Sequence, residues 1–213
     1  FGTETVYGLG ADATQPEAVA RIFAAKNRPR FNPPISHFPT AAAAFAHVVA
    51  CPLAHALADR FWPGPLTLVL PRAPGSTISD LAADGLATLA VRVPRGDTVT
   101  QLLTLAGCPV AAPSANRSGR ISPSDATHVL AELDGRIDAV LDTGPCPAGL
   151  ASTVMALPTP SAPCLLPPGR PTLGRPCPRF RPPRRSAPPR DAAPPPPPRR
   201  PSLPPAPLPA RPS

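Results

Sequence analysis

The sequence lacks the common motifs that hold phosphates, dinucleotides or catalytic metals. Its 213 residues contain no G-x-x-x-x-G-K-[ST] loop, no G-x-G-x-x-G fingerprint, no nucleophile elbow and no H-E-x-x-H pair. No apolar run reaches the roughly 18 residues that a membrane span requires. These absences exclude the usual nucleotide-binding loops and zinc proteases, and we expect no membrane association.

Cysteine is sparse, and its spacing does not suggest a metal site. The five cysteines form no C-x-x-C pair and no cluster with histidine at metal-ligand spacing. An odd, scattered set without a signal peptide indicates reduced thiols. We therefore expect a cytoplasmic protein with no protein-bound metal.

Charge and proline are distributed unevenly along the chain. Residues 158–213 contain ten arginines, one acidic residue (Asp191) and 23 of the 39 prolines. This segment has a net charge of +9 and residues 1–157 a net charge of −1, which together give the formal +8. A segment so rich in Pro and Arg cannot bury enough apolar surface to offset the entropy of ordering it. We predict a folded domain over 1–157 and a disordered tail over 158–213, with weak, salt-sensitive RNA binding by the tail as an open alternative to a functionless one.

Helical and extended patterns alternate through the predicted domain. Capping residues, prolines and glycines delimit helices over 16–28, 40–50, 52–61, 97–107 and 124–135. Short apolar runs predict strands over 66–70, 89–93, 109–112, 137–141 and 152–157. This mixture indicates an α/β domain.

Three segments carry polar residues suited to ligand binding. Residues 3–10 combine hydroxyls, a carboxylate and glycines, which fits either a small polar ligand or a strand that ends in a tight turn. Residues 26–32 place three cations in a proline-held loop, as a triphosphate requires. Residues 112–119 follow a predicted strand, where open α/β sheets bind ligands, although an ordinary Ser/Asn/Gly turn has the same composition. Arg92 lies between Val91 and Val93, so it is either an edge residue that faces water or a buried cation that awaits an anion, and we favour the buried cation.

Five blocks in the sequence resemble one known family. They are T-E-T-V-Y-G-L-G at 3–10, the Lys26-x-Arg28 pair, F-W-P-G-P-L-T at 61–67, A-V-R-V-P at 90–94 and A-P-S-A-N-R-S-G at 112–119. In order and spacing they are similar to the YrdC-like threonylcarbamoyl-AMP synthases. The resemblance implies a YrdC/RibB-like fold: a twisted, open mixed sheet flanked by helices, with a concave basic cavity.

The resemblance also implies a reaction. L-Threonine and bicarbonate would give N-carboxythreonine, whose carboxylate attacks the α-phosphorus of ATP and expels pyrophosphate. Mg²⁺ would accompany the ATP phosphates. The threonylcarbamoyl-AMP formed would pass to a separate transferase complex that modifies ANN-decoding tRNA.

Site residues are implied by position within the matching blocks. L-Threonine would contact Thr5, His37, Arg92 and Ser152. ATP would contact Arg28, Asn32, Thr88, Ser114 and Ser122. The expected catalytic set is Lys26, Arg28, Ser114 and Asn116, the family's Lys-x-Arg and Ser-x-Asn signature.

Several positions depart from the family pattern. Gly2 stands where the family has proline, Ala151 replaces a glutamate and Pro167 replaces an arginine that would contact ATP. The strand expected before Gly2 is absent from the sequence, which predicts a truncated start. Two alternatives therefore stay open: a catalytically impaired protein that only binds nucleotide or RNA, and a fragment of a carbamoyl-transfer hydrogenase maturation factor.

Overall fold

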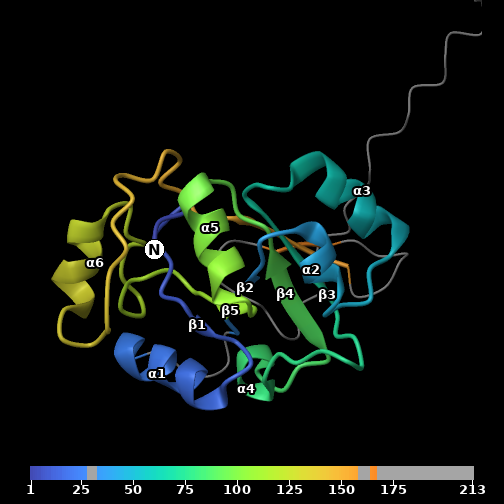
Figure 1. Ribbon diagram of the computed structural model, residues 1–213, viewed down its shortest axis with the longest axis horizontal. Helices are drawn as coiled ribbons and strands as arrows, with labels where there is room; N and C mark the ends of the chain where they lie inside the picture. The colour runs from blue at the N-terminus through green and yellow to red at the C-terminus, as the bar shows by residue number, and fades with distance from the viewer. Residues whose placement is uncertain (28–32, 158–163, 167–213) are drawn as a thin grey trace, which may run out of the picture. The chain divides into compact units, whose positions relative to one another are not determined.

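The computed structural model describes residues 1–27, 33–157 and 164–166, which belong to one compact unit, Phe1–Phe180 (Figure 1). Its centre is a seven-stranded mixed sheet in the order β1-β5-β2-β4-β3-β6-β7. The strands are β1 (Ala11–Asp12), β2 (Ser36–His37), β3 (Leu66–Pro71), β4 (Thr88–Arg92), β5 (Val110–Ala111), β6 (Thr153–Ala156) and β7 (Cys164–Leu166). The predicted α/β class with a mixed sheet is confirmed.

Strands β3 and β4 form the middle of the sheet. They pair antiparallel with Leu68 opposite Val91, and both of these side chains are fully buried. On the outer side of each lies a parallel neighbour: β6 beside β3 and β2 beside β4. Because β2 is parallel to β4, His37 and Arg92 occupy equivalent positions on adjacent strands. The sheet thus places two predicted ligand-binding residues side by side.

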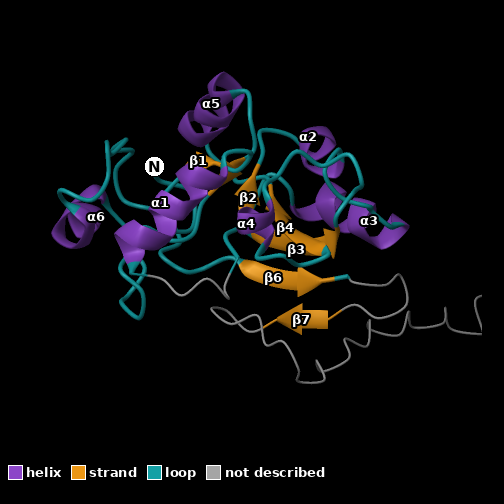
Figure 2. Cartoon of the chain, turned by 90° about the horizontal axis from the view of Figure 1, so that it is seen from below, coloured by secondary structure: helices purple, strands orange, loops and turns teal. Residues whose placement is uncertain are grey.

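Six helices occur among the described residues. They are α1 (Pro16–Lys26), α2 (Ala41–Phe45), α3 (Pro52–Phe61), α4 (Asp80–Ala83), α5 (Asp97–Ala106) and α6 (Ala126–Leu133). Helices α1 and α4 lie side by side (Figure 1), and Figure 2 shows α5 and α2 apart from the β6–β7 end of the sheet. No helix in the described part of the chain is both long and apolar enough to cross a bilayer.

Local signals account for the helix ends that the sequence predicted correctly. Pro16 occupies the first turn of α1, where its missing N–H costs nothing, and Asn27 ends the helix in the left-handed region with φ of 48°. Gly107 ends α5 in the same region with φ of 63°. The Asp125 carboxylate accepts the His128 backbone N–H at 2.9 Å and caps α6.

Three expectations from the sequence are wrong in detail. The helix expected over 40–50 ends at Phe45, because Val48 turns into a bridge with Arg72 beside the sheet. The strand expected over 137–141 is irregular, and its Ile137 and Val140 pack against a small apolar cluster around Tyr7 instead of pairing in the sheet.

The third correction concerns the predicted tail. Cys164–Leu166 form β7, paired antiparallel with β6, so these three residues are not disordered (Figure 2). The backbone groups of β6 that face away from β3 would lack partners without this strand. The remainder of the predicted tail lies outside the described residues.

Candidate active site

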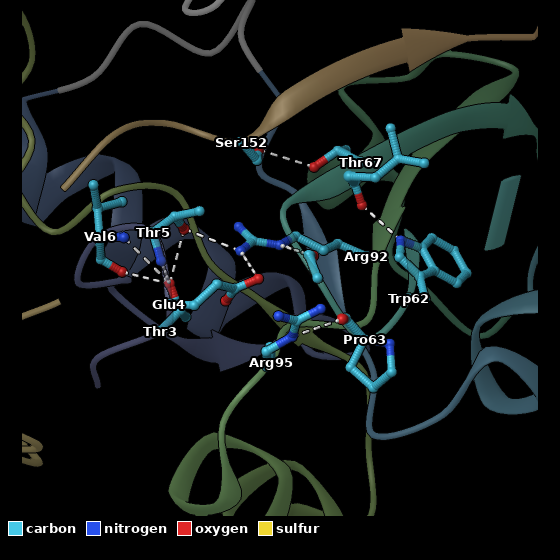
Figure 3. A network of polar contacts seen from close by, with 12 residues as sticks. Thr3, Glu4, Thr5, Val6, Trp62, Pro63, Thr67, Arg92, Arg95 and Ser152 are labelled. Carbon is cyan, nitrogen blue, oxygen red and sulfur yellow. Dashed lines mark hydrogen bonds and ion pairs between the residues drawn. The ribbon is translucent and has the colours of Figure 1, made fainter. Parts of the chain in front are cut away.

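Arg92, the last residue of β4, is a buried cation, as its apolar neighbours predicted. Only 3% of the residue is exposed. Its Nη2 donates to the Thr5 hydroxyl at 3.0 Å and its Nε donates to the Gly64 carbonyl at 3.2 Å (Figure 3). These two contacts fix the guanidinium plane before any ligand arrives, which is the condition for strong recognition of a carboxylate.

The anionic partner of Arg92 is Glu4. Glu4 Oε1 lies 2.9 Å from Arg92 Nη2 as an ion pair, without the angles that a hydrogen bond requires. Both carboxylate oxygens of Glu4 are buried, and neither accepts a hydrogen bond from any residue that the structure describes. Figure 3 shows the two side chains converging from the loop that holds Glu4 and from the end of β4. The pair is well placed electrostatically and poorly satisfied in hydrogen bonds.

A compact turn holds Thr5 toward Arg92. The Thr3 hydroxyl accepts the backbone N–H groups of Thr5 and Val6 at 3.2 and 3.3 Å and donates to the Val6 carbonyl at 2.7 Å (Figure 3). It also lies 2.9 Å from the Thr5 hydroxyl. The segment 3–10 is therefore a turn stabilised by hydroxyl groups. It is not the end of a strand, which the sequence left open as the alternative to a ligand site.

His37 contributes a buried, uncharged imidazole beside Arg92. Its Nδ1 lies 3.0 Å from the Ile35 carbonyl. Burial, and secondarily the positive charge of Arg92, lower the pKa of His37 to about 3. The ring is therefore neutral at physiological pH, so that of these two neighbouring side chains only Arg92 carries a charge.

Lys26 organises a second polar cluster at the end of α1. The residue is 1% exposed, and its Nζ donates to the backbone carbonyls of Ser114 and Asn116. Asn116 Nδ2 in turn donates to the carbonyls of Arg117 and Arg120, each at 2.8 Å. Among the described residues no donor reaches Asn116 Oδ1, which is buried. Lys26 thus holds the 114–120 turn in shape.

The two clusters are joined through the backbone. Gly8 forms an isolated bridge with Ser114, and the Ala115 N–H donates to the Tyr7 carbonyl at 2.8 Å. The turn that presents Thr5 to Arg92 therefore continues directly into contact with the turn that Lys26 holds. Both clusters are parts of one polar assembly.

The structure does not bring every predicted residue into this assembly. Ser152 lies at the start of β6 with its hydroxyl 3.0 Å from that of Thr67 (Figure 3). Thr88 begins β4, at the opposite end of that strand from Arg92. Ser122 is half-buried in the loop before α6, next to Pro123, whose carbonyl accepts the Tyr7 N–H at 2.9 Å. Arg28 and Asn32 lie outside the described residues.

Two participants were not predicted from the sequence. Glu4 lies within the T-E-T-V-Y-G-L-G block and Gly64 within the F-W-P-G-P-L-T block, and neither is among the predicted site residues. The signal for Gly64 is steric: an added Cβ would lie 2.2 Å from the Phe61 carbonyl oxygen, so only glycine fits there. No sequence signal separates Glu4 from an ordinary exposed carboxylate.

A separate cavity of about 520 Å³ lies between α1, α5 and the segment 136–141. Its lining is largely apolar, with Arg21 and Arg136 among its charged members. None of the predicted ligand-binding residues lines it.

Within residues 1–27, 33–157 and 164–166, no three His, Cys, Asp or Glu side chains are grouped to hold a metal ion. The one buried carboxylate of the assembly, Glu4, is paired with Arg92. A Mg²⁺ ion carried by nucleotide phosphates stays a prediction.

An α/β domain with a buried arginine, a neutral histidine and oriented hydroxyls has the features of a protein class that binds small polar ligands. Comparison with known proteins narrows that class. Residues 1–169 match the family model Sua5/YciO/YrdC, described as "Telomere recombination". The chain belongs to the Sua5/YciO/YrdC family.

Individual relatives agree with this assignment. The chain is 46% identical over 172 residues to a threonylcarbamoyl-AMP synthase of Pyrococcus abyssi and 45% identical over 170 residues to one of Bacillus subtilis, covering 79% of this chain in each case. It spans only 49% of the length of each. Among solved structures, P. abyssi Sua5 complexed with L-threonine matches with a TM-score of 0.75 at 45% identity, over 79% of this chain and 49% of that one. The MTH1692 protein of Methanobacterium thermoautotrophicum matches with a TM-score of 0.61 at 31% identity, over 85% and 84%.

A weaker likeness bears on the alternative of a hydrogenase maturation factor. Full-length HypF matches with a TM-score of 0.65 at 20% identity and over 25% of its length, which shows a shared fold only.

Proposed function

We propose that this chain forms threonylcarbamoyl-AMP and pyrophosphate from L-threonine, bicarbonate and ATP. The observation that carries the proposal is the fixed, buried Arg92, held by Thr5 and Gly64 and set next to neutral His37. A buried, oriented guanidinium of this kind can bind the carboxylate of an amino acid. Relatives 45 to 46% identical carry the name threonylcarbamoyl-AMP synthase, and one neighbouring structure contains L-threonine.

The chemistry asks for positioning and not for covalent help from the protein. The threonine amino group adds to bicarbonate with loss of water and gives a carbamate. One carbamate oxygen then attacks the α-phosphorus of ATP, and the bond to pyrophosphate breaks. A carboxylate-type nucleophile is already deprotonated at neutral pH, so no general base is required for this second step. Oriented cations and hydroxyls stabilise the developing charge.

The second polar cluster supports the proposed position of the nucleotide. The turn 114–120, held by Lys26, presents Ser114 and Asn116 next to the segment that carries Thr5. Arg28 and Asn32 follow α1 in the sequence, so we assign ATP phosphates to this side, with Ser122 and Thr88 as further predicted contacts. Mg²⁺ would arrive on those phosphates and reduce their charge.

The biological setting is proposed from the same reaction. The product would be consumed by a tRNA-modifying transferase complex that acts on ANN-decoding tRNA, and the protein would work in the cytoplasm. RNA binding by the Arg-rich segment is a separate prediction that the reaction does not require.

Mass spectrometry of the product tests the proposal. The chain, incubated with ATP, Mg²⁺, L-threonine and bicarbonate, should yield threonylcarbamoyl-AMP, and omission of any one substrate should abolish it. Arg28→Ala should reduce the yield at least roughly tenfold, because a charge-assisted contact to phosphate is lost. Arg60→Ala, at the exposed end of α3, serves as the matched control and should retain the wild-type yield.

The replacements Ala151 and Pro167 favour a second candidate, a binding protein without turnover. That protein would bind ATP in a titration and form no threonylcarbamoyl-AMP. This result would overturn the proposed activity, as would equal yields from Arg28→Ala and the unaltered chain.

A further inference from the structure

We propose that Glu4 binds the amino group of the amino-acid substrate while Arg92 binds its carboxylate, so that the two residues together recognise a zwitterion. This inference rests on the proposed function, since it concerns the same substrate site. It adds a substrate-binding residue that none of the predicted contacts included.

The unsatisfied carboxylate of Glu4 supports this assignment. Both oxygens of Glu4 are buried and accept no hydrogen bond from the residues that the structure describes. A buried acceptor without a donor is costly, and more so when it is charged. A carboxylate can accept about four hydrogen bonds. A ligand with several N–H donors at this point would remove the cost.

The ion pair of Glu4 and Arg92 also matches the charged groups of an α-amino acid. Glu4 Oε1 and Arg92 Nη2 are 2.9 Å apart, so one anionic and one cationic group face the same point (Figure 3). In an α-amino acid the amino and carboxylate groups are separated by a single carbon atom. The ligand's two charged groups therefore meet their opposites at adjacent positions. The ligand's ammonium and carboxylate would replace the attraction that Glu4 and Arg92 lose when they separate.

The net charge around Glu4 and Arg92 favours a zwitterion as well. Glu4 and Arg92 sum to zero, and the low pKa of His37 keeps that ring neutral. Arg95, the other cation drawn near the pair, is an exposed residue whose Nε donates to the Pro63 carbonyl at 3.2 Å (Figure 3). A neutral, polar environment suits a zwitterion better than a simple carboxylate, which would leave Glu4 unpaired and add a second negative charge beside it.

Contact with Glu4 is compatible with the proposed chemistry. The ammonium first releases one proton to solvent, the neutral amine then reacts with bicarbonate with loss of water, and the carbamate nitrogen retains one N–H. That N–H can continue to donate to Glu4 while the new carboxylate group extends toward the nucleotide.

Calorimetric titration of the unaltered chain with two ligands provides the first test. L-Threonine is compared with (R)-3-hydroxybutyrate, which is threonine without its amino group and is smaller, so it meets no steric barrier. The proposal predicts that L-threonine binds roughly 10- to 100-fold more tightly, the worth of a charge-assisted hydrogen bond. Equal affinities would overturn this inference alone, whereas no binding of L-threonine would overturn the proposed function with it.

The isosteric variant Glu4→Gln provides the second test. It removes the negative charge and should weaken L-threonine binding while (R)-3-hydroxybutyrate binds as well as before or better, so that the ratio of the two affinities falls below about threefold. Glu17→Gln, the same change at an exposed position in the first turn of α1, should leave the ratio unchanged. If Glu4 were only a structural counterion for Arg92, Glu4→Gln would weaken both ligands equally, and an unchanged ratio would overturn the proposal.

Discussion

At the scale of single residues, the site depends on polar groups that are buried before any ligand binds. Arg92, Lys26 and His37 are each at most 3% exposed. Charged groups are costly to bury, and here each has oriented partners: Thr5 and Gly64 for Arg92, and two backbone carbonyls for Lys26. These side chains are thus ordered during folding, so that less conformational entropy is lost when the ligand binds.

The buried histidine makes a prediction about stability and pH. In the unfolded chain His37 binds a proton below about pH 6.5, whereas in the folded chain burial and Arg92 hold its pKa at about 3. Its contribution to stability is therefore complete above pH 6.5 and is lost as the pH falls from 6.5 toward 3. Relative to His37→Gln, the unaltered chain should lose about 2 to 3 kcal/mol more of its unfolding free energy between pH 7 and pH 4.5.

Urea unfolding of both proteins at the two pH values measures this difference. The variant itself provides the control, because every other acidic group titrates alike in both chains. Identical pH dependence in the two proteins would contradict a buried, neutral His37.

At the scale of elements, the sequence predicted the parts whose ends carry local signals. The helix from Pro16, the helix ending at Gly107 and the apolar β3 and β4 all lie close to their expected positions. Strands β1 and β2 have only two residues each, which is too short for any periodicity to appear. The run 137–141 has a strand-like pattern, yet apolar residues that pack from an irregular segment give the same pattern.

The candidate site likewise contains residues that the sequence predicted and residues that it did not. Burial of Arg92 followed from its apolar neighbours, while the roles of Thr5, His37 and Ser152 came only through family resemblance. Glu4 was missed because its position depends on how a loop folds against the end of β4, a contact between residues 88 apart in the sequence. Lys26 donates to the turn at 114–116, and its predicted contact with phosphate stays a prediction.

That contact between α1 and the turn makes a prediction for Lys26→Met. The variant leaves the carbonyls of Ser114 and Asn116 without this charged donor, so we expect a loss of about 2 kcal/mol in unfolding free energy and reduced product formation. Arg21→Met, on the exposed face of the same helix, should change neither property measurably. Unfolding in urea, followed by the product assay, measures both. Equal stability of the two variants would show that the turn does not depend on Lys26.

At the scale of the whole molecule, the candidate site and the excess of positive charge lie in different parts of the chain. Residues 1–157 are nearly neutral, so the cations of the site act through their placement and not through an excess of positive charge. The family match extends to residue 169, beyond the first residues of the Pro/Arg-rich segment, and β7 lies within it. The chain spans about half the length of the P. abyssi and B. subtilis relatives, so what the matched half does by itself is the central question.

A crystal structure of the chain in complex with L-threonine tests most directly whether the matched half binds this substrate by itself. The account predicts one threonine molecule with its carboxylate on Arg92 and within reach of the Thr5 hydroxyl. Threonine bound elsewhere, such as in the cavity between α1 and the segment 136–141, with Arg92 still contacting only Glu4, Thr5 and Gly64, would contradict it.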